Sequence, residues 1–441
     1  MKFSMQNIST WLVYFLPITL MTGPAIPDIS ISIIALMFIF YSFLNKNFLW
    51  LKESWIKSAV IFWISIIFVS FFAINKKLSF TDSLIFIRYI IFSIALYSWI
   101  LIDESKLKKL LSIIFISLIF VAIDCYIQFL RYDPILGFGK DIFGFLPTHY
   151  GRLTGPFNDQ VPGAHLSKFF FISIFLIIYF YKNYNLKKYI IFFYFVSIGL
   201  IIFFSGEKMA FATFGLGVLV LLFIFKKDRA IFIISTISLF LLIFLTINLH
   251  KSYNDFKIIE TNPYHLGLTL KKEYNCENTS KKCSKIIEVQ PRFLDVIYEF
   301  KSSVYYQIYL SAFKMWEDNK LTGVGLNNYE FVCNKYPKYQ TKKTNYGNCS
   351  AHPHNNYIQW LTESGLIGFI FFIIFIINLF KSSFKEIYRE SNKISLITLL
   401  VIFWPIMSTG SFLKNWNGIE TFFVIGIAMV LTKKMKKNND K

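Results

Sequence analysis

The stretch His354-Asn355-Asn356-Tyr357-Ile358-Gln359-Trp360-Leu361-Thr362-Glu363-Ser364-Gly365-Leu366-Ile367-Gly368 places a histidine and two amides at the start of an apolar segment. That segment runs to about residue 380 and is long enough to cross a membrane as a helix. A histidine at its edge meets water as well as hydrocarbon, and its near-neutral pKa suits it to proton transfer. The alternative is a polar helix start, in which Asn355 or Asn356 caps free backbone N–H groups.

The composition indicates a protein that crosses the membrane several times. Hydrophobic residues make up 55% of the chain, which contains 52 Phe. A helix needs roughly 20 apolar residues to cross a hydrocarbon core of ~30 Å. The net charge of +20 is spread over short loops. With no basic face and no nucleic-acid-binding motif, the predicted partner is the lipid bilayer and not nucleic acid.

Apolar runs between polar breaks predict an all-α integral membrane protein with about twelve transmembrane helices. The predicted spans are residues 8–24, 28–44, 58–74, 82–102, 109–129, 165–181, 188–205, 209–225, 230–249, 356–380, 394–412 and 417–432.

Lysine and arginine are distributed as expected if both termini are cytoplasmic. With the N-terminus inside, the internal loops carry most of these residues and the short external loops carry few. Two long segments then lie outside, at about 130–164 and 250–353. The predicted organisation is a membrane bundle of nine spans (1–249), a periplasmic loop domain (250–353), and three further spans with a basic cytoplasmic tail (354–441). A helix is expected from Pro291 to Asn319.

Four of the five cysteines fall in the large outer loop. An even set in an oxidising compartment predicts two disulfides. Of three possible pairings, short-range closure favours Cys276 with Cys283 and Cys333 with Cys349. The alternative is zinc, bound by these cysteines with nearby histidines, but no close CxxC pair supports it. No metal is therefore predicted.

Ionisable residues within or beside spans are costly and are candidates for function. Arg88 lies within the fourth predicted span, Asp124 on the outer half of the fifth, and Glu207 and Lys208 in the hairpin after the seventh. A structural alternative for Arg88 and Asp124 is a mutual ion pair between two helices. For Glu207 and Lys208 the alternative is a solvated hairpin tip.

Four cations are expected on the outer side of the membrane. If Arg88, Arg152, Lys208 and Arg292 converge, they form a cationic pocket at the outer leaflet. Guanidinium groups bind phosphate oxygens in a bidentate fork, and lysine adds a point charge. Such a pocket suits a lipid with a diphosphate headgroup.

Four motifs in this chain resemble those of the O-antigen ligases and O-antigen polymerases. The first is His354-Asn355 followed by Gly365 and Gly368. The others are Arg152 to Asn158, the Ser-Gly-Glu-Lys hairpin at 205–208, and Leu321 to Leu326. The resemblance runs from about Arg88 to Gly368, and it includes the layout of twelve spans with a large outer loop before the histidine helix.

The resemblance implies an inverting, metal-independent membrane glycosyltransferase of the bacterial inner membrane that needs no cofactor. It would move a glycan from an undecaprenyl-diphosphate carrier to an acceptor hydroxyl, such as that of lipid A-core. His354 would be the base for that hydroxyl, with Asn355 beside it. Lys208, Arg152 and a loop arginine would hold the diphosphate, because preorganised cations stabilise a leaving group that gathers negative charge.

Two positions depart from the family pattern. The hairpin carries Lys208 where arginine is usual, which keeps the charge and loses the fork. Where the family places an arginine before the Gly-Val-Gly turn, this chain has Tyr305-Tyr306-Gln307, so Arg292 is the nearest candidate.

Three other functions compete with transfer to lipid A-core, and one of them is transfer of the oligosaccharide from the same donor to a protein. A polymerase would use the same donor and join repeat units. A transporter or flippase would be a different class, since twelve spans is a common count, but such folds usually show two related halves. No six-plus-six repeat is visible here.

Overall fold

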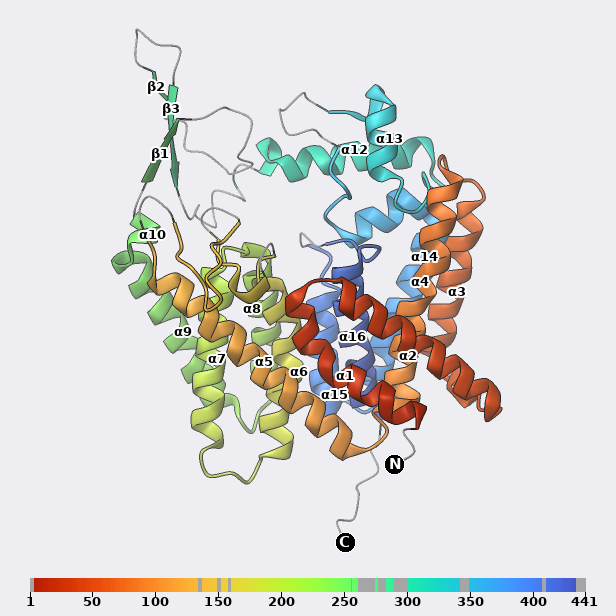
Figure 1. Cartoon of the computed structure of the whole chain (residues 1–441), viewed down its shortest axis with the longest axis horizontal. Helices are drawn as coiled ribbons and strands as arrows, with labels where there is room; N and C mark the ends of the chain where they lie inside the picture. Colours follow the sequence, from red (N-terminus) through yellow and green to blue (C-terminus); the bar gives the residue numbers. More distant parts are fainter. Residues whose placement is uncertain are drawn as a thin grey trace.

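The computed structural model describes residues 4–133, 137–148, 152–157, 160–254, 256–260, 274–276, 283–288, 298, 300–341, 349–406 and 410–433. Each of the twelve predicted spans contains a helix, although α15 ends at Ile402 and the predicted span runs to 412 (Figure 1). The first nine are α1 (Met5–Thr22), α2 (Ala25–Leu44), α3 (Ser54–Ser70), α4 (Lys76–Ala95), α5 (Glu104–Leu130), α6 (Gly163–Phe175), α7 (Lys187–Phe204), α8 (Lys208–Ile224) and α9 (Arg229–Leu249). The last three are α14 (Asn356–Phe384), α15 (Glu390–Ile402) and α16 (Asn415–Leu431). Two π-helical turns, η2 (Leu96–Ile100) and η4 (Leu176–Phe180), extend α4 and α6.

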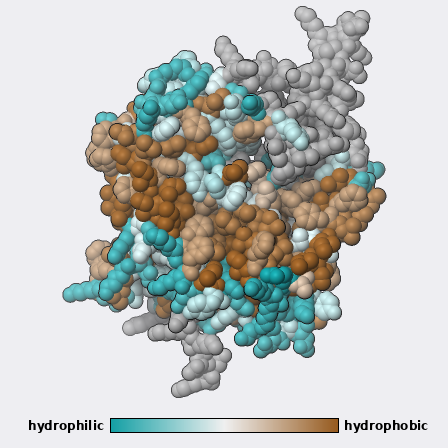
Figure 2. Space-filling model, turned by 180° about the vertical axis from the view of Figure 1, so that it is seen from behind, coloured by the Kyte–Doolittle hydropathy of each residue, from teal (hydrophilic) through white to brown (hydrophobic). Residues whose placement is uncertain are grey.

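By length and composition, seven of the described helices can cross a membrane: α2, α4 with η2, α5, α6 with η4, α7, α9 and α14. Three more, α3, α8 and α16, are apolar and shorter. A broad hydrophobic region crosses the face drawn in Figure 2, with hydrophilic residues gathered at its edges. The chain is therefore a multi-pass helical membrane protein by class, and the count of twelve spans stays a prediction.

Polar side chains start several helices by satisfying backbone N–H groups that have no partner within the helix. Ser4 accepts a hydrogen bond from the backbone N–H of Asn7 at the start of α1, and Asn75 accepts one from Leu78 at the start of α4. Between these caps the apolar segments pack through aromatic rings. Phe62 of α3 lies 4.9 Å from Trp360 of α14, centroid to centroid.

The insert between α9 and α14, which is predicted to lie outside, is mixed in structure. It contains α10 (Lys251–Asn254) and a three-stranded antiparallel sheet of β1 (Phe256–Glu260), β2 (Tyr274–Cys276) and β3 (Cys283–Glu288), in the order β1-β3-β2. This sheet was not predicted from the sequence. Two helices follow, α12 (Val304–Asp318) and α13 (Tyr329–Lys335).

Helix α12 covers the later part of the helix expected from Pro291 to Asn319. It starts at Val304, where Ser303 accepts a hydrogen bond from the backbone N–H of Tyr306. Residues 291–297 and 299 lie outside the described residues. Its buried face contains Ile308, Ala312 and Met315, which pack in a small core shared with α13.

The start of α1 and Lys433, two residues after the end of α16, lie at the same end of the bundle. Gln6 donates a hydrogen bond to the carbonyl of Trp99, and Lys433 donates one to the carbonyl of Tyr97. Both acceptors belong to η2. The start of α1 and the end of α16 therefore lie on the same side of the bundle, as the distribution of lysine and arginine predicts. That this side faces the cytoplasm stays a prediction.

Candidate functional site

Helix α14 is broken at Gly365, where the chain has φ 60° and ψ −166°. The turn before α13 docks into this break. The N–H groups of Val324 and Gly325 bond to the carbonyls of Thr362 and Glu363, at 3.0 and 2.9 Å. On the other side of the break, the N–H of Leu366 bonds to the carbonyl of Lys320 at 2.9 Å. The backbone groups freed by the break are thus satisfied by the turn, as burial requires.

Glycine is required on both sides of this contact. A Cβ on Gly365 would lie 2.3 Å from the carbonyl oxygen of Leu321, and one on Gly323 would lie 2.5 Å from the carbonyl carbon of Glu363. Both residues also have positive φ, at 60° and 68°, which glycine adopts without steric cost. The Gly-Val-Gly motif and the glycine of the histidine motif therefore form one structural unit.

His354 lies at the mouth of α14 and is partly buried. Its ring is 4.1 Å from that of His352 and 5.7 Å from that of Tyr305, centroid to centroid. Burial lowers its pKa from the usual 6.5. The neutral imidazole, which can accept a proton, is therefore the main form at neutral pH.

Asn355 is the N-cap of α14. Its side-chain oxygen accepts hydrogen bonds from the N–H groups of Tyr357 and Ile358, at 3.0 and 3.1 Å. Its amide nitrogen donates to the carbonyl of Pro405 at 2.8 Å. Of Asn355 and Asn356, the two candidates for the cap, Asn355 is therefore the one that caps the helix. This cap fixes the backbone next to His354 without using the histidine side chain.

Gln128 of α5 holds the loop that carries Arg152 through hydrogen bonds to its backbone. The Gln128 side-chain oxygen accepts hydrogen bonds from the N–H groups of Thr154 and Gly155, at 3.1 and 2.9 Å. Phe157, at the end of this loop, lies 5.0 Å from the His165 ring and 5.7 Å from the Trp416 ring. Asn158, which ends the motif, lies outside the described residues.

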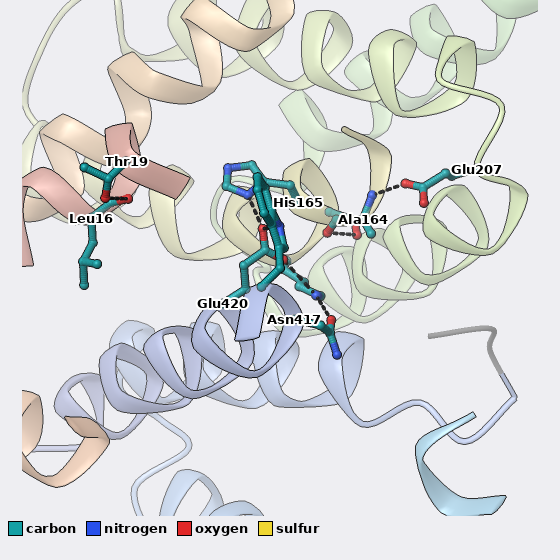
Figure 3. Close-up of polar contacts among 10 residues, drawn as sticks. Leu16, Thr19, Ala164, His165, Glu207, Asn417 and Glu420 are labelled. Carbon is teal, nitrogen blue, oxygen red and sulfur yellow. Dashed lines mark hydrogen bonds and ion pairs between the residues drawn. The ribbon is translucent and has the colours of Figure 1, made fainter. Parts of the chain in front are cut away.

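The Glu207 hairpin docks on the start of α6. One carboxylate oxygen of Glu207 accepts a hydrogen bond from the N–H of Ala164 at 2.5 Å (Figure 3). Burial raises the pKa of Glu207 to about 7, although Arg152 and Lys168 favour its ionised form. The structure thus brings Arg152 and Glu207 close enough to interact, and Lys208 follows directly as the first residue of α8. The hairpin is therefore not the solvated tip that charge alone suggests.

Glu207 gives the protein a pH-dependent stability. Its carboxyl has a pKa of about 7 in the folded chain against a reference value of 4.5. The folded state therefore holds this proton more tightly, and the contribution of Glu207 to stability falls as the pH rises from about 4.5 through 7. Glu207→Gln removes this titration and is expected to flatten thermal stability against pH over that window. Unfolding of purified protein at a series of pH values measures this, with Glu317→Gln on the exposed face of α12 as control. Equal slopes for wild type and Glu207→Gln would contradict it.

A buried charged cluster that we did not predict joins α6 to α16. His165 Nδ1 lies 2.6 Å from one oxygen of the Glu420 carboxylate, and Lys168 Nζ lies 3.0 Å from the other. Trp416 donates to the same carboxylate at 3.0 Å, and Lys168 also donates to Asn417 at 2.7 Å. Figure 3 shows His165 and Asn417 on either side of Glu420. A sequence signal existed, because Lys168 and Glu420 fall inside the predicted spans 165–181 and 417–432, where charge is costly.

A chain of contacts links this cluster to the histidine helix. Asn417 donates to the carbonyl of Gly410 at 2.6 Å, and Gln359 of α14 donates to the hydroxyl of Ser411 at 2.8 Å. Gln359 also donates to the buried carboxylate of Glu363, which accepts from the N–H of Tyr329 as well. The starts of α6, α14 and α16 are therefore tied together at one end of the bundle.

Arg88 and Asp124 do not form the ion pair weighed above. Arg88 pairs with Asp28 of α2 at 2.8 Å and donates to Asn415 at 3.0 Å, which ties α2, α4 and α16 together. Asp124 instead accepts a hydrogen bond from the N–H of Ile142 at 2.7 Å and anchors the loop after α5. The alternative was wrong because each residue meets a closer partner on another segment.

The residues of the insert between α9 and α14 are described in part. Cys333 and Cys349 form a disulfide with their Cα atoms 5.3 Å apart, which ties α13 to the segment that leads into His354. Cys276 and Cys283 face each other in the register of β2 and β3, and their side chains lie outside the described part of the chain, as does Arg292. Within the described residues, no group of three or more His, Cys, Asp or Glu side chains is placed to hold a metal ion.

Together, the fold and the site define a multi-pass helical membrane protein with a partly buried histidine and several charged groups at one end of its bundle. Residues 192–373 match the family model described as O-antigen ligase. The match confirms the resemblance to the O-antigen ligase superfamily. It covers less than half of the chain and includes the Glu207 hairpin, the Gly-Val-Gly turn and His354. No curated protein is similar enough to this chain to count as a match.

Proposed function

We propose that this chain is a membrane glycosyltransferase of the O-antigen ligase type. It takes a glycan from an undecaprenyl-diphosphate carrier and joins it to an acceptor hydroxyl at the periplasmic face of the inner membrane. The observation that supports this most is His354, a partly buried histidine with a lowered pKa at the mouth of a broken apolar helix. Its helix, α14, is joined through Gln359 and the segment at Gly410 and Ser411 to the cluster around Glu420.

The proposed reaction is an inverting displacement at the anomeric carbon of the donor sugar. The imidazole of His354 accepts the proton of the acceptor hydroxyl while the oxygen bonds to that carbon. The bond from the carbon to the phosphate oxygen breaks, and undecaprenyl diphosphate leaves with the electron pair. Arg152 and Lys208 stabilise the charge that gathers on the diphosphate. Asn355 positions His354 by fixing the helix start.

Of the other proposed diphosphate ligands, Arg88 is the weaker candidate because its Nη2 already contacts Asp28 and Asn415. Arg292 stays a proposal on sequence grounds alone. Asp124 and Glu207 are positioning residues that do not bind the substrate themselves. They anchor the first outer loop and the hairpin by accepting hydrogen bonds from backbone N–H groups.

The role of Lys208 is tested by paired variants. Lys208→Ala should weaken binding of the lipid-linked donor, which raises KM for the donor more than it lowers kcat. Lys208→Arg should keep most activity, because the diphosphate requires the charge and arginine is usual at this position in the family. Kinetics of purified protein with donor at several concentrations measure both effects. An inactive arginine variant beside an active alanine variant would refute the role.

The acceptor distinguishes a ligase from a polymerase. A strain that lacks the protein should accumulate long lipid-linked polymer if the protein is a ligase that acts on lipid A-core. It should accumulate a single lipid-linked repeat unit if the protein joins repeat units. Analysis of the carrier-linked glycans by size separates the two.

A further inference from the structure

A polar pocket lies at the opposite end of the bundle, where α2 ends, α3 begins and η2 meets Lys433, two residues after α16. It has a volume of about 250 Å³, and its lining includes Tyr41, Ser42, Trp50, Glu53, Tyr97 and Lys433. The volume suits a small polar group and not a drug-sized ligand, which needs ~300–1,000 Å³. None of these residues takes part in the site described above.

The pocket contains one charge of each sign. The ammonium of Lys433 donates a hydrogen bond to the carbonyl of Tyr97 at 2.8 Å and lies 3.6 Å from the centre of the Tyr97 ring. That bond uses one of the three N–H groups of the ammonium. The Glu53 carboxylate is the other charged group in the lining. With one carboxylate and one ammonium, the lining is close to neutral overall and complements a ligand that carries both charges.

A buried hydroxyl in the lining has no partner. Ser42 is 1% exposed, and within the described residues its Oγ makes no hydrogen bond. Leaving a buried polar group unsatisfied is unfavourable, and most such groups in proteins are paired with protein or ordered solvent. An oxygen-rich ligand in the pocket would satisfy it.

The pocket also borders the apolar surface of α2. Phe40, Phe43 and Leu44, on the last turns of that helix, are 56%, 67% and 61% exposed. Hydrocarbon chains lying along this surface would leave a headgroup level with the end of the helix. Aromatic rings at Tyr41 and Trp50 add faces that attract an ammonium group.

We propose that this pocket binds the headgroup of a zwitterionic aminophospholipid on the side of the membrane predicted to be cytoplasmic. The phosphate meets the Lys433 ammonium and the Ser42 hydroxyl. The primary ammonium meets the Glu53 carboxylate and the aromatic rings. A purely anionic headgroup is disfavoured because Glu53 repels it, and a quaternary ammonium is disfavoured because it has no N–H to donate to that carboxylate. The proposal does not depend on the glycan-transfer reaction.

Native mass spectrometry of the purified full-length protein tests this with three lipids: phosphatidylethanolamine, phosphatidylcholine and phosphatidylglycerol. Phosphatidylethanolamine is expected to bind saturably and at least ~5-fold more tightly than either of the others. O-phosphoethanolamine, added as a soluble competitor, should displace it only at much higher concentration. Equal binding of phosphatidylglycerol would overturn the proposal, and displacement by O-phosphoethanolamine at the concentration of the lipid would overturn the assignment to a lipid.

Variants test the named contacts. Glu53→Gln is expected to reduce the preference for phosphatidylethanolamine over phosphatidylglycerol by ~10-fold, since it removes the group that repels the anionic headgroup. Ser42→Ala should weaken binding several-fold and leave the fold intact, because its hydroxyl has no partner to lose. Lys52→Gln, on the exposed residue next to Glu53, should bind like wild type. Unchanged lipid preference in both Glu53→Gln and Ser42→Ala would refute the site. If a variant does not fold, the comparison of the three lipids on the wild-type protein still tests the proposal.

Discussion

Replacing His354 by alanine is expected to lower the rate of glycan transfer by ~10²–10⁴-fold, the typical effect of losing a positioned general base. The protein should still fold, because the helix cap is made by Asn355 and the break in α14 is satisfied by backbone groups. Transfer assays on purified protein measure the rate, and size-exclusion chromatography measures folding.

His352→Ala is the matched control for this experiment. Its ring lies 4.1 Å from that of His354, and it stands two residues before the motif histidine. A much milder effect is expected there. If the two variants lose the same activity, or if His354→Ala only reduces the amount of folded protein, then His354 has a structural role.

The largest expected loss of stability follows from Glu420→Ala. This change removes the carboxylate shared by His165 and Lys168 and leaves the Lys168 ammonium buried without its counter-charge. Breaking a buried pair on one side typically costs ~3–5 kcal/mol, because the remaining charge stays desolvated. Thermal unfolding in detergent measures the loss, and the exposed residue Glu317, changed to alanine, is the control.

A double variant separates charge from shape in this cluster. Replacing both Lys168 and Glu420 by methionine removes both charges while keeping much of the side-chain volume. Much of the lost stability should return, as it does when buried ion pairs are replaced by apolar residues of similar size. A double variant no more stable than Glu420→Ala would mean that the cluster acts through hydrogen bonds from Trp416 and not through charge balance.

The sequence predicted the positions of the helices well because apolar length and polar breaks are local properties. It also placed His354 at a helix mouth, since an asparagine before an apolar run is a local capping signal. The partners of charged groups were harder to predict. Arg88 meets Asp28 and Asn415, and the latter lies 327 residues further along the chain. No local pattern indicates such a contact.

The break in α14 also depends on contacts between distant segments, which a local sequence pattern does not predict. A mainly apolar segment from 356 to 380 predicts one continuous helix, whereas the structure interrupts it at Gly365 and inserts the turn around Gly323. The glycines are visible in the sequence, but the close approach that requires them depends on tertiary packing between two segments. The Glu420 cluster was missed for a different reason, since its charges lie within apolar segments that were assigned as spans by their average character.

The most direct test of the proposed glycosyltransferase activity is an assay of glycan transfer by the purified protein in proteoliposomes that contain a lipid-linked donor and a hydroxyl acceptor. We expect a new glycosidic bond of inverted anomeric configuration, release of undecaprenyl diphosphate, and loss of both in His354→Ala. Movement of the intact lipid-linked glycan across the bilayer, with no glycosidic bond formed, would contradict it and indicate a flippase.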